Sequence, residues 1–255
     1  YGQSEKVARS QTGAGTESLG EFFMKIVYAI ILSACFVGAE NKTEFYKPIV
    51  KDVEGWTIAV EPRLLADDNK ALADKCLVAL ANHLQRIKYI LPEEKWKPLQ
   101  KLPIRLELHN ERLSSMQYHP SVSWLRANRH DPALAKHVHI PRARALIDRG
   151  MWAKHPYVIL HELAHAYHDQ VLSFDNKDII GAYEAMRRAG IYEKVMLYTG
   201  RTVRHYGLNN HKEYFAESTE AYLGVNDFYP FVRAELEKHD PRMYRVMQKI
   251  WGPVR

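Results

Sequence analysis

Two histidines lie four residues apart in the segment His161–His165, which reads HELAH, and a glutamate directly follows the first. On a helix, residues at this spacing lie on one face about one turn apart, so both imidazoles can reach the same metal ion. Glu162 can then act as a general base toward a water at that ion. Two nitrogen ligands leave room for a third protein ligand and an open position. The segment therefore predicts a zinc site that carries out hydrolysis.

The residues around this motif favour a metal site over a chance match. The chain has 13 histidines, so two exposed histidines on a helix could also fall four apart by accident. Four apolar residues, however, follow a helical period and predict a buried stripe, which leaves both histidines on a different face. The stripe consists of Leu160, Leu163, Tyr167 and Val171. Pro156 suits the first turn of such a helix, where its missing N–H costs nothing.

The third ligand has to come from elsewhere in the chain. One extended zinc-peptidase pattern, HExxHxxGxxH, fails because His168 and Val171 occupy its last two fixed positions. The best candidate is the segment Asn210–Gly224, which begins with a capping residue and ends with glycine, as helices do. On this helix Glu213 and Glu217 share one face. One carboxylate could bind the metal while the other accepts a hydrogen bond from the second ring nitrogen of a ligand histidine.

These acidic residues also allow two simpler interpretations. Glu220 continues the acidic run, so the three glutamates could form a solvated face of the helix. Alternatively, Glu213 could complete a capping box with Asn210 at the start of the helix. We favour the metal site because the HELAH segment already supplies two ligands upstream.

Three parts of the sequence, taken in order, resemble a known enzyme family. HELAH is followed by Tyr206-Gly207 and then by the segment Glu213–Glu217, which reads EYFAE. This order is similar to the catalytic domain of anthrax lethal factor and related gluzincin metallopeptidases. In that family a Tyr-Gly pair precedes a Glu-aromatic-Phe-Ala-Glu helix, and the tyrosine stands seven residues before the ligand glutamate, as Tyr206 does here. The resemblance spans Val158–Gly224, about a quarter of the chain.

The resemblance implies a role for each matching residue. It implies that zinc is held by His161, His165 and Glu213, and that Glu162 is the catalytic base. It also implies that the Tyr206 hydroxyl stabilises the oxyanion, and that Glu217 supports a ligand through a hydrogen bond. The substrate class of lethal factor is not carried over, because nothing in this chain resembles the substrate-docking or receptor-binding parts of that larger toxin.

The predicted function is that of a secreted zinc peptidase, and more narrowly an endopeptidase, which hydrolyses peptide bonds of a peptide or protein substrate with zinc-activated water. Two alternatives stay open. One is a catalytically silent zincin-like domain that only binds, although the intact Glu162 and Tyr206 argue against it. The other is a zinc hydrolase that acts on a non-protein amide such as a cell-wall peptide.

Peptidases of this kind commonly bind substrate along the free edge of a sheet. The alternating segment ahead of the HELAH helix, with His137, Val138 and His139, is the candidate edge strand, and an interior strand is its alternative. His211 is a further candidate for substrate contact because it lies beside the predicted third ligand.

The N-terminal region predicts export from the cytoplasm. Met24 and Lys25 precede an apolar run over 26–37, which is typical of a signal peptide over 24–39 and is too short for a membrane span. Residues 1–23 are predicted to be an unstructured leader. A lipoprotein cleavage box that ends at Cys35 would instead give a lipid-anchored protein, and an apolar helix packed on the domain is a third interpretation. We favour a secreted or periplasmic protein without an integral membrane segment after cleavage.

Charge and cysteine content narrow the functional class. The net charge is +6, and its basic residues are dispersed without a nucleic-acid-binding motif, so we expect no nucleic-acid partner. After signal cleavage only Cys76 remains. This thiol falls on an apolar helical face, which predicts a buried free cysteine and a domain that depends on its core for stability.

The elements that must position these residues indicate an α+β fold. Strands are predicted at Trp56–Val60 and Ile104–Leu108, and a long helix at about Asp68–Ile90. Ile179–Ala189 should be helical, and Asp240-Pro241 should open a last helix that ends near Gly252. Strands lie early and helices late. We therefore expect one zincin-like domain over 40–255, with a small sheet on its N-terminal side, the active-site helix and C-terminal helices.

Overall fold

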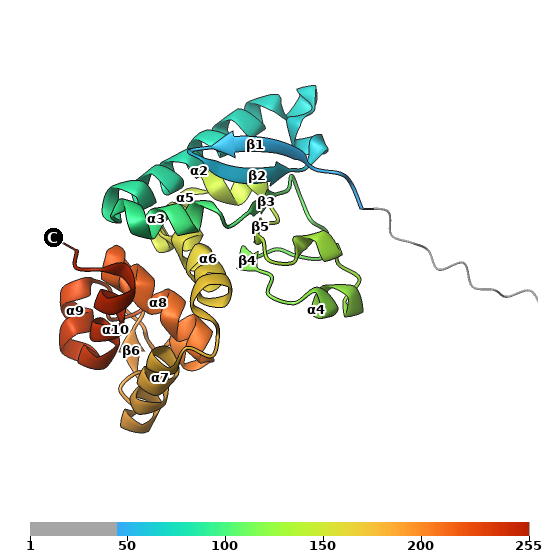
Figure 1. The fold of residues 1–255 in the computed structure, drawn as a ribbon. Helices are drawn as coiled ribbons and strands as arrows, with labels where there is room; N and C mark the ends of the chain where they lie inside the picture. The colour runs from blue at the N-terminus through green and yellow to red at the C-terminus, as the bar shows by residue number, and fades with distance from the viewer. Residues whose placement is uncertain (1–44, 255) are drawn as a thin grey trace, which may run out of the picture. The chain divides into compact units, whose positions relative to one another are not determined.

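The computed structural model describes residues 45–254, in which short strands and helices alternate at first and helices dominate later (Figure 1). This is a mixed α+β fold, as predicted from the sequence. The described residues belong to one compact unit that begins at Phe45. The predicted leader over 1–23, the signal peptide over 24–39 and the lipidation alternative at Cys35 lie outside the described residues.

A five-stranded mixed sheet forms the N-terminal side of the unit. Its spatial order is β1-β2-β3-β5-β4; the two outer strands run antiparallel to their neighbours, whereas β2, β3 and β5 are parallel to one another. A two-residue turn with positive φ at Glu54 and Gly55 joins β1 to β2, as a tight hairpin requires. The strands are β1 (Ile49–Val53), β2 (Trp56–Val60), β3 (Ile104–Leu106), β4 (Gln117–Tyr118) and β5 (Val138–Ile140).

The predicted edge strand is an interior strand. β5 pairs with β3 on one side and with β4 on the other, and Val138 and His139 are fully buried. The free edge of the sheet on this side belongs to β4. This strand has only two residues, which is too short for an alternating pattern to mark it in the sequence. The strand predicted to start at Ile104 ends at Leu106, two residues earlier than expected.

Helices of the first half cover this sheet and lead to the motif. α2 (Lys70–Ile90) buries Ala73, Cys76 and Leu80 at three- and four-residue spacing, which is the apolar stripe of a packed helix. Cys76 is a buried free thiol, as predicted, and burial raises its pKa to about 11. The other helices here are α3 (Glu93–Gln100), α4 (Val122–Ala127) and α5 (Arg149–Lys154).

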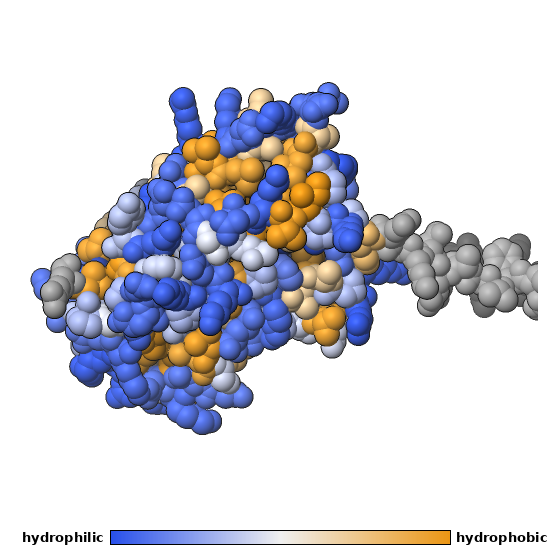
Figure 2. Space-filling view, turned by 45° about the horizontal axis from the view of Figure 1, so that its top comes forward, coloured by the Kyte–Doolittle hydropathy of each residue, from blue (hydrophilic) through white to orange (hydrophobic). Residues whose placement is uncertain are grey.

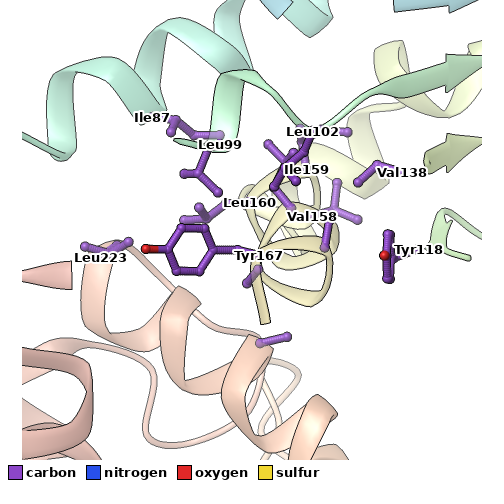
Figure 3. Packing of buried hydrophobic residues seen from close by; sticks show 14 of the residues in the cluster. Ile87, Leu99, Leu102, Tyr118, Val138, Val158, Ile159, Leu160, Tyr167 and Leu223 are labelled. Carbon is purple, nitrogen blue, oxygen red and sulfur yellow. The ribbon is translucent and has the colours of Figure 1, made fainter. Parts of the chain in front are cut away.

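The HELAH segment lies on α6 (Val158–Tyr167), which is the central helix of the fold. It contacts α2, α3, β4 and β5 on one side and α8 (His211–Leu223) on the other (Figure 1). Figure 3 shows its apolar residues among side chains of α2, α3 and β5. Of its ten residues only His165 is partly exposed. Because both sides are covered, α6 is held rigidly in the core.

Both ends of α6 differ from the prediction. Pro156 precedes the helix, whose N-cap is Tyr157. After Tyr167 the chain makes a π-helical turn over His168–Leu172, which shifts the helical phase by adding a residue to the turn. As a result Val171 is 47% exposed, so the predicted buried stripe ends at Tyr167.

Four helices and a small hairpin make up the C-terminal half. α7 ends at Gly190, whose φ of 65° permits the left-handed cap, and Asp240 caps α10 by accepting a hydrogen bond from the Met243 N–H; both helix ends were predicted. The elements are α7 (Lys177–Ala189), β6 (Val195–Met196), β7 (Thr202–Val203), α8, α9 (Arg233–His239) and α10 (Pro241–Trp251).

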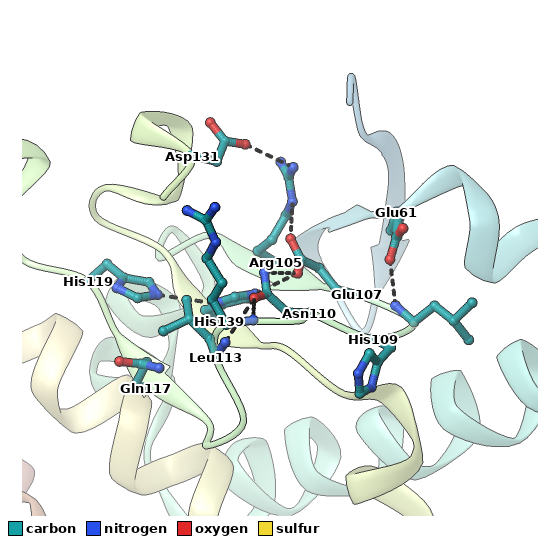
Figure 4. Close-up of polar contacts among 12 residues, drawn as sticks. Glu61, Arg105, Glu107, His109, Asn110, Leu113, Gln117, His119, Asp131 and His139 are labelled. Atoms are coloured by element: carbon teal, nitrogen blue, oxygen red, sulfur yellow. Dashed lines mark hydrogen bonds and ion pairs between the residues drawn. The ribbon is translucent and has the colours of Figure 1, made fainter. Parts of the chain in front are cut away.

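A buried polar network fixes the loops around β4 (Figure 4). Arg105 on β3 is 2% exposed and pairs with Asp131 at 3.2 Å. Glu107 accepts from Asn110 at 2.7 Å and lies 3.3 Å from His139, whose other ring nitrogen meets His119 at 3.1 Å. Since buried charges need partners, these contacts hold the loops on both sides of β4 against the sheet.

Figure 2 shows one face on which hydrophilic residues predominate and apolar residues form separate patches. Among the helices of the described part of the chain, none combines the length and apolar character needed to cross a membrane.

Candidate metal centre

Three side chains from α6 and α8 converge on one point. His161 and His165 lie one turn apart on α6, and their Nε2 atoms are 3.1 Å from each other. Glu213 lies in the first turn of α8, where its N–H is capped by Asn210, and its Oε2 is 3.1 Å from His165 Nε2 and 3.4 Å from His161 Nε2. The structure thus brings together the three residues that the sequence predicts as ligands.

These separations suit a zinc ion. Zinc bonds to nitrogen and oxygen are about 2.0–2.1 Å long, so ligand atoms at tetrahedral angles lie about 3.3 Å apart. The three observed distances, 3.1, 3.1 and 3.4 Å, are close to this value. Two imidazoles and one carboxylate are also a donor set that zinc accepts, and all three residues line one cleft. The residues present therefore fit a catalytic zinc ion.

Glu220 orients the first histidine. Its Oε1 is 2.6 Å from His161 Nδ1, and this contact assigns the ring proton to Nδ1 and leaves the lone pair of Nε2 facing the other two ligand atoms. Burial opposes protonation of His161, but hydrogen bonds with Glu213 and Glu220 outweigh it and raise the pKa of the imidazole.

The sequence-based assignment of this hydrogen bond to Glu217 is wrong. Glu217 Oε1 lies 4.0 Å from His161 Nδ1, and the residue one turn further along α8 makes the contact. The solvated acidic face is also excluded, because Glu217 and Glu220 are at most 2% exposed. The side chain of Glu213 points to the two histidines, so capping is not its role.

Glu220→Gln is expected to weaken zinc binding by about tenfold, the lower end of the effect of residues that hold a ligand in place. The amide keeps the size of the side chain but loses the charge that favours the required tautomer of His161. Zinc affinity can be measured by competition with a chromophoric chelator, with Glu237→Gln on the exposed face of α9 as the matched control. Equal affinities for the two variants would remove Glu220 from this role.

Glu162 lies in the cleft with the three candidate ligands. This cleft has a volume of about 750 Å³. Its side chain is 7% exposed, and burial raises the pKa of the carboxyl above its usual range. A carboxylate with a raised pKa beside a metal site is suited to accept and return a proton.

Tyr206 lies on the wall of the same cleft and is 47% exposed. It begins the turn Tyr206–Leu208, which is fixed because His205 Nδ1 accepts a hydrogen bond from the Gly207 N–H at 2.9 Å. A Cβ on Gly207 would stand 3.1 Å from the Tyr214 Cα, so glycine lets the turn pack closely on α8. The negative charge of Glu213 raises the pKa of the Tyr206 hydroxyl and keeps it a proton donor.

The four residues suggested for substrate contact do not line the cleft. Val138 and His139 are buried inside the sheet, and His137 is half-buried with its Nδ1 2.9 Å from the Ala135 carbonyl. The His211 Nε2 is 2.9 Å from the Phe174 carbonyl oxygen.

One wall of the cleft is formed by the segment over 114–118, which includes β4. The Tyr118 hydroxyl donates to Asp169 at 2.5 Å and so joins this wall to the turn after α6.

Three residues at the site were not predicted as functional. His155 shares Glu220 with His161, since its Nε2 lies 2.9 Å from the same Oε1. Asp227 lines the cleft after the end of α8. The spacing of Glu220 from Glu213 placed both on the same helical face, and this spacing could have been used to predict its role. No such sequence signal marks His155 or Asp227.

Comparison of the chain with models of known protein families, with curated proteins and with solved structures finds no match.

Proposed function

We propose that this protein is a zinc-dependent endopeptidase with a zincin-like domain of the gluzincin type. The observation that carries the proposal is the meeting of His161, His165 and Glu213 at distances suited to zinc, with Glu162 directly beside them in an open cleft. The order of these residues along the chain agrees with the family resemblance. Export, as expected from residues 24–39, belongs to the same proposal.

The residues of the cleft can divide the chemistry of amide hydrolysis. Zinc, when bound, would make a water more acidic and polarise the scissile carbonyl. Glu162 would take the proton of the attacking water and pass it to the leaving amine. The Tyr206 hydroxyl would donate a hydrogen bond to the oxyanion. Glu220 would hold the His161 ring in its required orientation throughout.

The cleft wall suits an extended peptide. Among the described residues β4 pairs with β5 alone, and its residues line the cleft. Its outer edge therefore offers backbone groups with which a peptide could pair as an added strand. This feature favours a peptide substrate over a small amide, and an endopeptidase over an enzyme with a closed pocket.

The test is cleavage of a mixture of synthetic peptides by the zinc-loaded protein, with products identified by mass spectrometry. We expect cleavage that stops when a chelator removes zinc and resumes when zinc is restored. Zinc uptake with no cleavage of any peptide would favour the silent binding domain. Cleavage of cell-wall peptides alone would favour the hydrolase of a non-protein amide.

Tyr206→Phe is expected to lower kcat by about ten- to a thousandfold, because only the hydroxyl that stabilises the oxyanion is lost. KM should change little, since the ring stays in place. Steady-state kinetics on a cleaved peptide measure both constants, and Tyr198→Phe serves as the control for removal of a partly exposed tyrosine hydroxyl. An unchanged kcat would remove Tyr206 from catalysis.

A further inference from the structure

We propose that Asp227 forms a subsite that binds a positively charged group of the substrate next to the metal centre. The charged group is an ammonium or a guanidinium, either at the N-terminus of the substrate or on a lysine or arginine side chain. The inference deepens the proposed function and rests on it for the identity of the substrate as a peptide.

Asp227 is largely buried, and no side chain among residues 45–254 bonds its carboxylate. The residue is 5% exposed and lines the cleft. Its backbone is fixed, since the N–H donates to Asn226 Oδ1 at 2.8 Å and the carbonyl oxygen accepts from the Tyr198 N–H at 2.8 Å. Within residues 45–254, by contrast, its side chain makes no hydrogen bond and no ion pair. A carboxylate held at the cleft wall with little exposure and no partner can be stabilised by a cation from the substrate.

Asp227 has both acidic and basic neighbours, and the basic ones in the cleft are His155 and Lys154. Glu217 lines the same cleft, is 2% exposed, and its Oε2 has no hydrogen-bond partner among the described residues. Glu220 is already shared by His155 and His161. Lys154 also lines the cleft, but it is exposed and forms no ion pair with Asp227. Because His155 is engaged by Glu220 and Lys154 is exposed, Asp227 is the acid here that a substrate cation could pair with.

The apolar residues beside Asp227 also suit such a group. Phe228 and Leu197 line the cleft and are held together by a backbone bridge between their segments. A lysine or arginine side chain has an aliphatic stem that can lie along apolar surface while its charged end reaches a carboxylate. The charge of Asp227 selects cations in general, and the apolar wall accommodates the longer ones.

The experiment compares matched synthetic peptides on the zinc-loaded full chain. In one series lysine replaces norleucine at each position in turn, and in the other the N-terminus is either free or acetylated. We expect one cationic peptide to be cleaved about tenfold faster, in kcat/KM, than its neutral partner. Asp227→Asn should bring this ratio close to one, whereas the exposed control Asp175→Asn should keep it.

The two series separate the sources of the charge. A preference confined to the free N-terminus assigns the subsite to the terminal amine, and a preference for one lysine position assigns it to a side chain. Either preference, if lost in Asp227→Asn, supports the subsite. No preference in the unaltered protein, or a preference that survives Asp227→Asn, overturns it.

A binding measurement keeps this test independent of the proposed peptidase activity. The same peptides, labelled with a dye, are titrated against the zinc-loaded Glu162→Gln variant and followed by fluorescence anisotropy. One outcome separates the two proposals: the unaltered protein cleaves no peptide, yet the cationic peptide binds about tenfold more tightly than the neutral one and loses this advantage with Asp227→Asn. In that case the peptidase proposal fails and the subsite stands. Equal binding of both peptides would reject the subsite whatever the activity.

Discussion

Glu162→Gln is expected to lower kcat for peptide cleavage by about a hundred- to ten-thousandfold while zinc stays bound. The amide has nearly the same size as the carboxyl but cannot accept the proton of the attacking water. None of the three ligand atoms belongs to Glu162, and its side chain forms no hydrogen bond in the described part of the chain, so the metal centre should keep its geometry. Turnover of a cleaved peptide and zinc content should be measured on the same sample.

The matched control for this variant is Glu184→Gln, which makes the same chemical change on the exposed surface of α7. It should keep full activity. Retained turnover in Glu162→Gln would exclude Glu162 as the base. Loss of zinc together with loss of activity would show that Glu162 acts through the metal centre and would leave its role as base unsupported.

Glu213→Ala is expected to weaken zinc binding by more than about a hundredfold, beyond the effect of residues that only support a ligand. The variant removes the one carboxylate oxygen that meets both Nε2 atoms and leaves two histidines from a single helix. Two histidines supply only two of the three protein ligands that a catalytic zinc site has. Metal content after dialysis and competition with a chelator measure the loss, and we expect about one zinc per chain in the unaltered protein.

Folding must be checked in the same experiment, because Glu213 lies in the first turn of α8. Its backbone N–H is capped by Asn210, and that bond does not involve the side chain that is removed. The helical circular dichroism signal should therefore stay unchanged. A folded variant that still holds one zinc with unaltered affinity would exclude Glu213 as a ligand. The control variant Glu237→Gln, on the exposed surface, should keep the zinc affinity of the unaltered protein.

The positions of residues that depend only on spacing within one helix, or on a helix-end residue, were predictable from the sequence. His161 and His165 lie one turn apart on any helix, and Asn210 marks the start of α8 by its type alone. The ends of α7 and α10 follow in the same way from glycine and from Asp-Pro. Each of these predictions depends on a few neighbouring residues, so the rest of the fold does not change it.

Features that depend on how elements pack were not predictable. One face of α8 carries Glu213, Glu217 and Glu220. The angle at which α8 crosses α6 decides whether Glu217 or Glu220 meets His161. Likewise β5 is an interior strand only because the two residues of β4 pair with its outer side. No local pattern encodes these relations, since each involves segments far apart in the sequence.

The single oxygen that His155 and His161 share makes the two residues energetically dependent on each other. Glu220 Oε1 lies within hydrogen-bond distance of both rings at once, so loss of one partner changes the position and charge of the carboxylate that the other partner meets. Substitutions at His155 and Glu220 should consequently be non-additive. The loop that leads into α6 therefore belongs to the same cooperative unit as the metal centre, although it supplies no ligand. Homologous proteins would be expected to change these positions together.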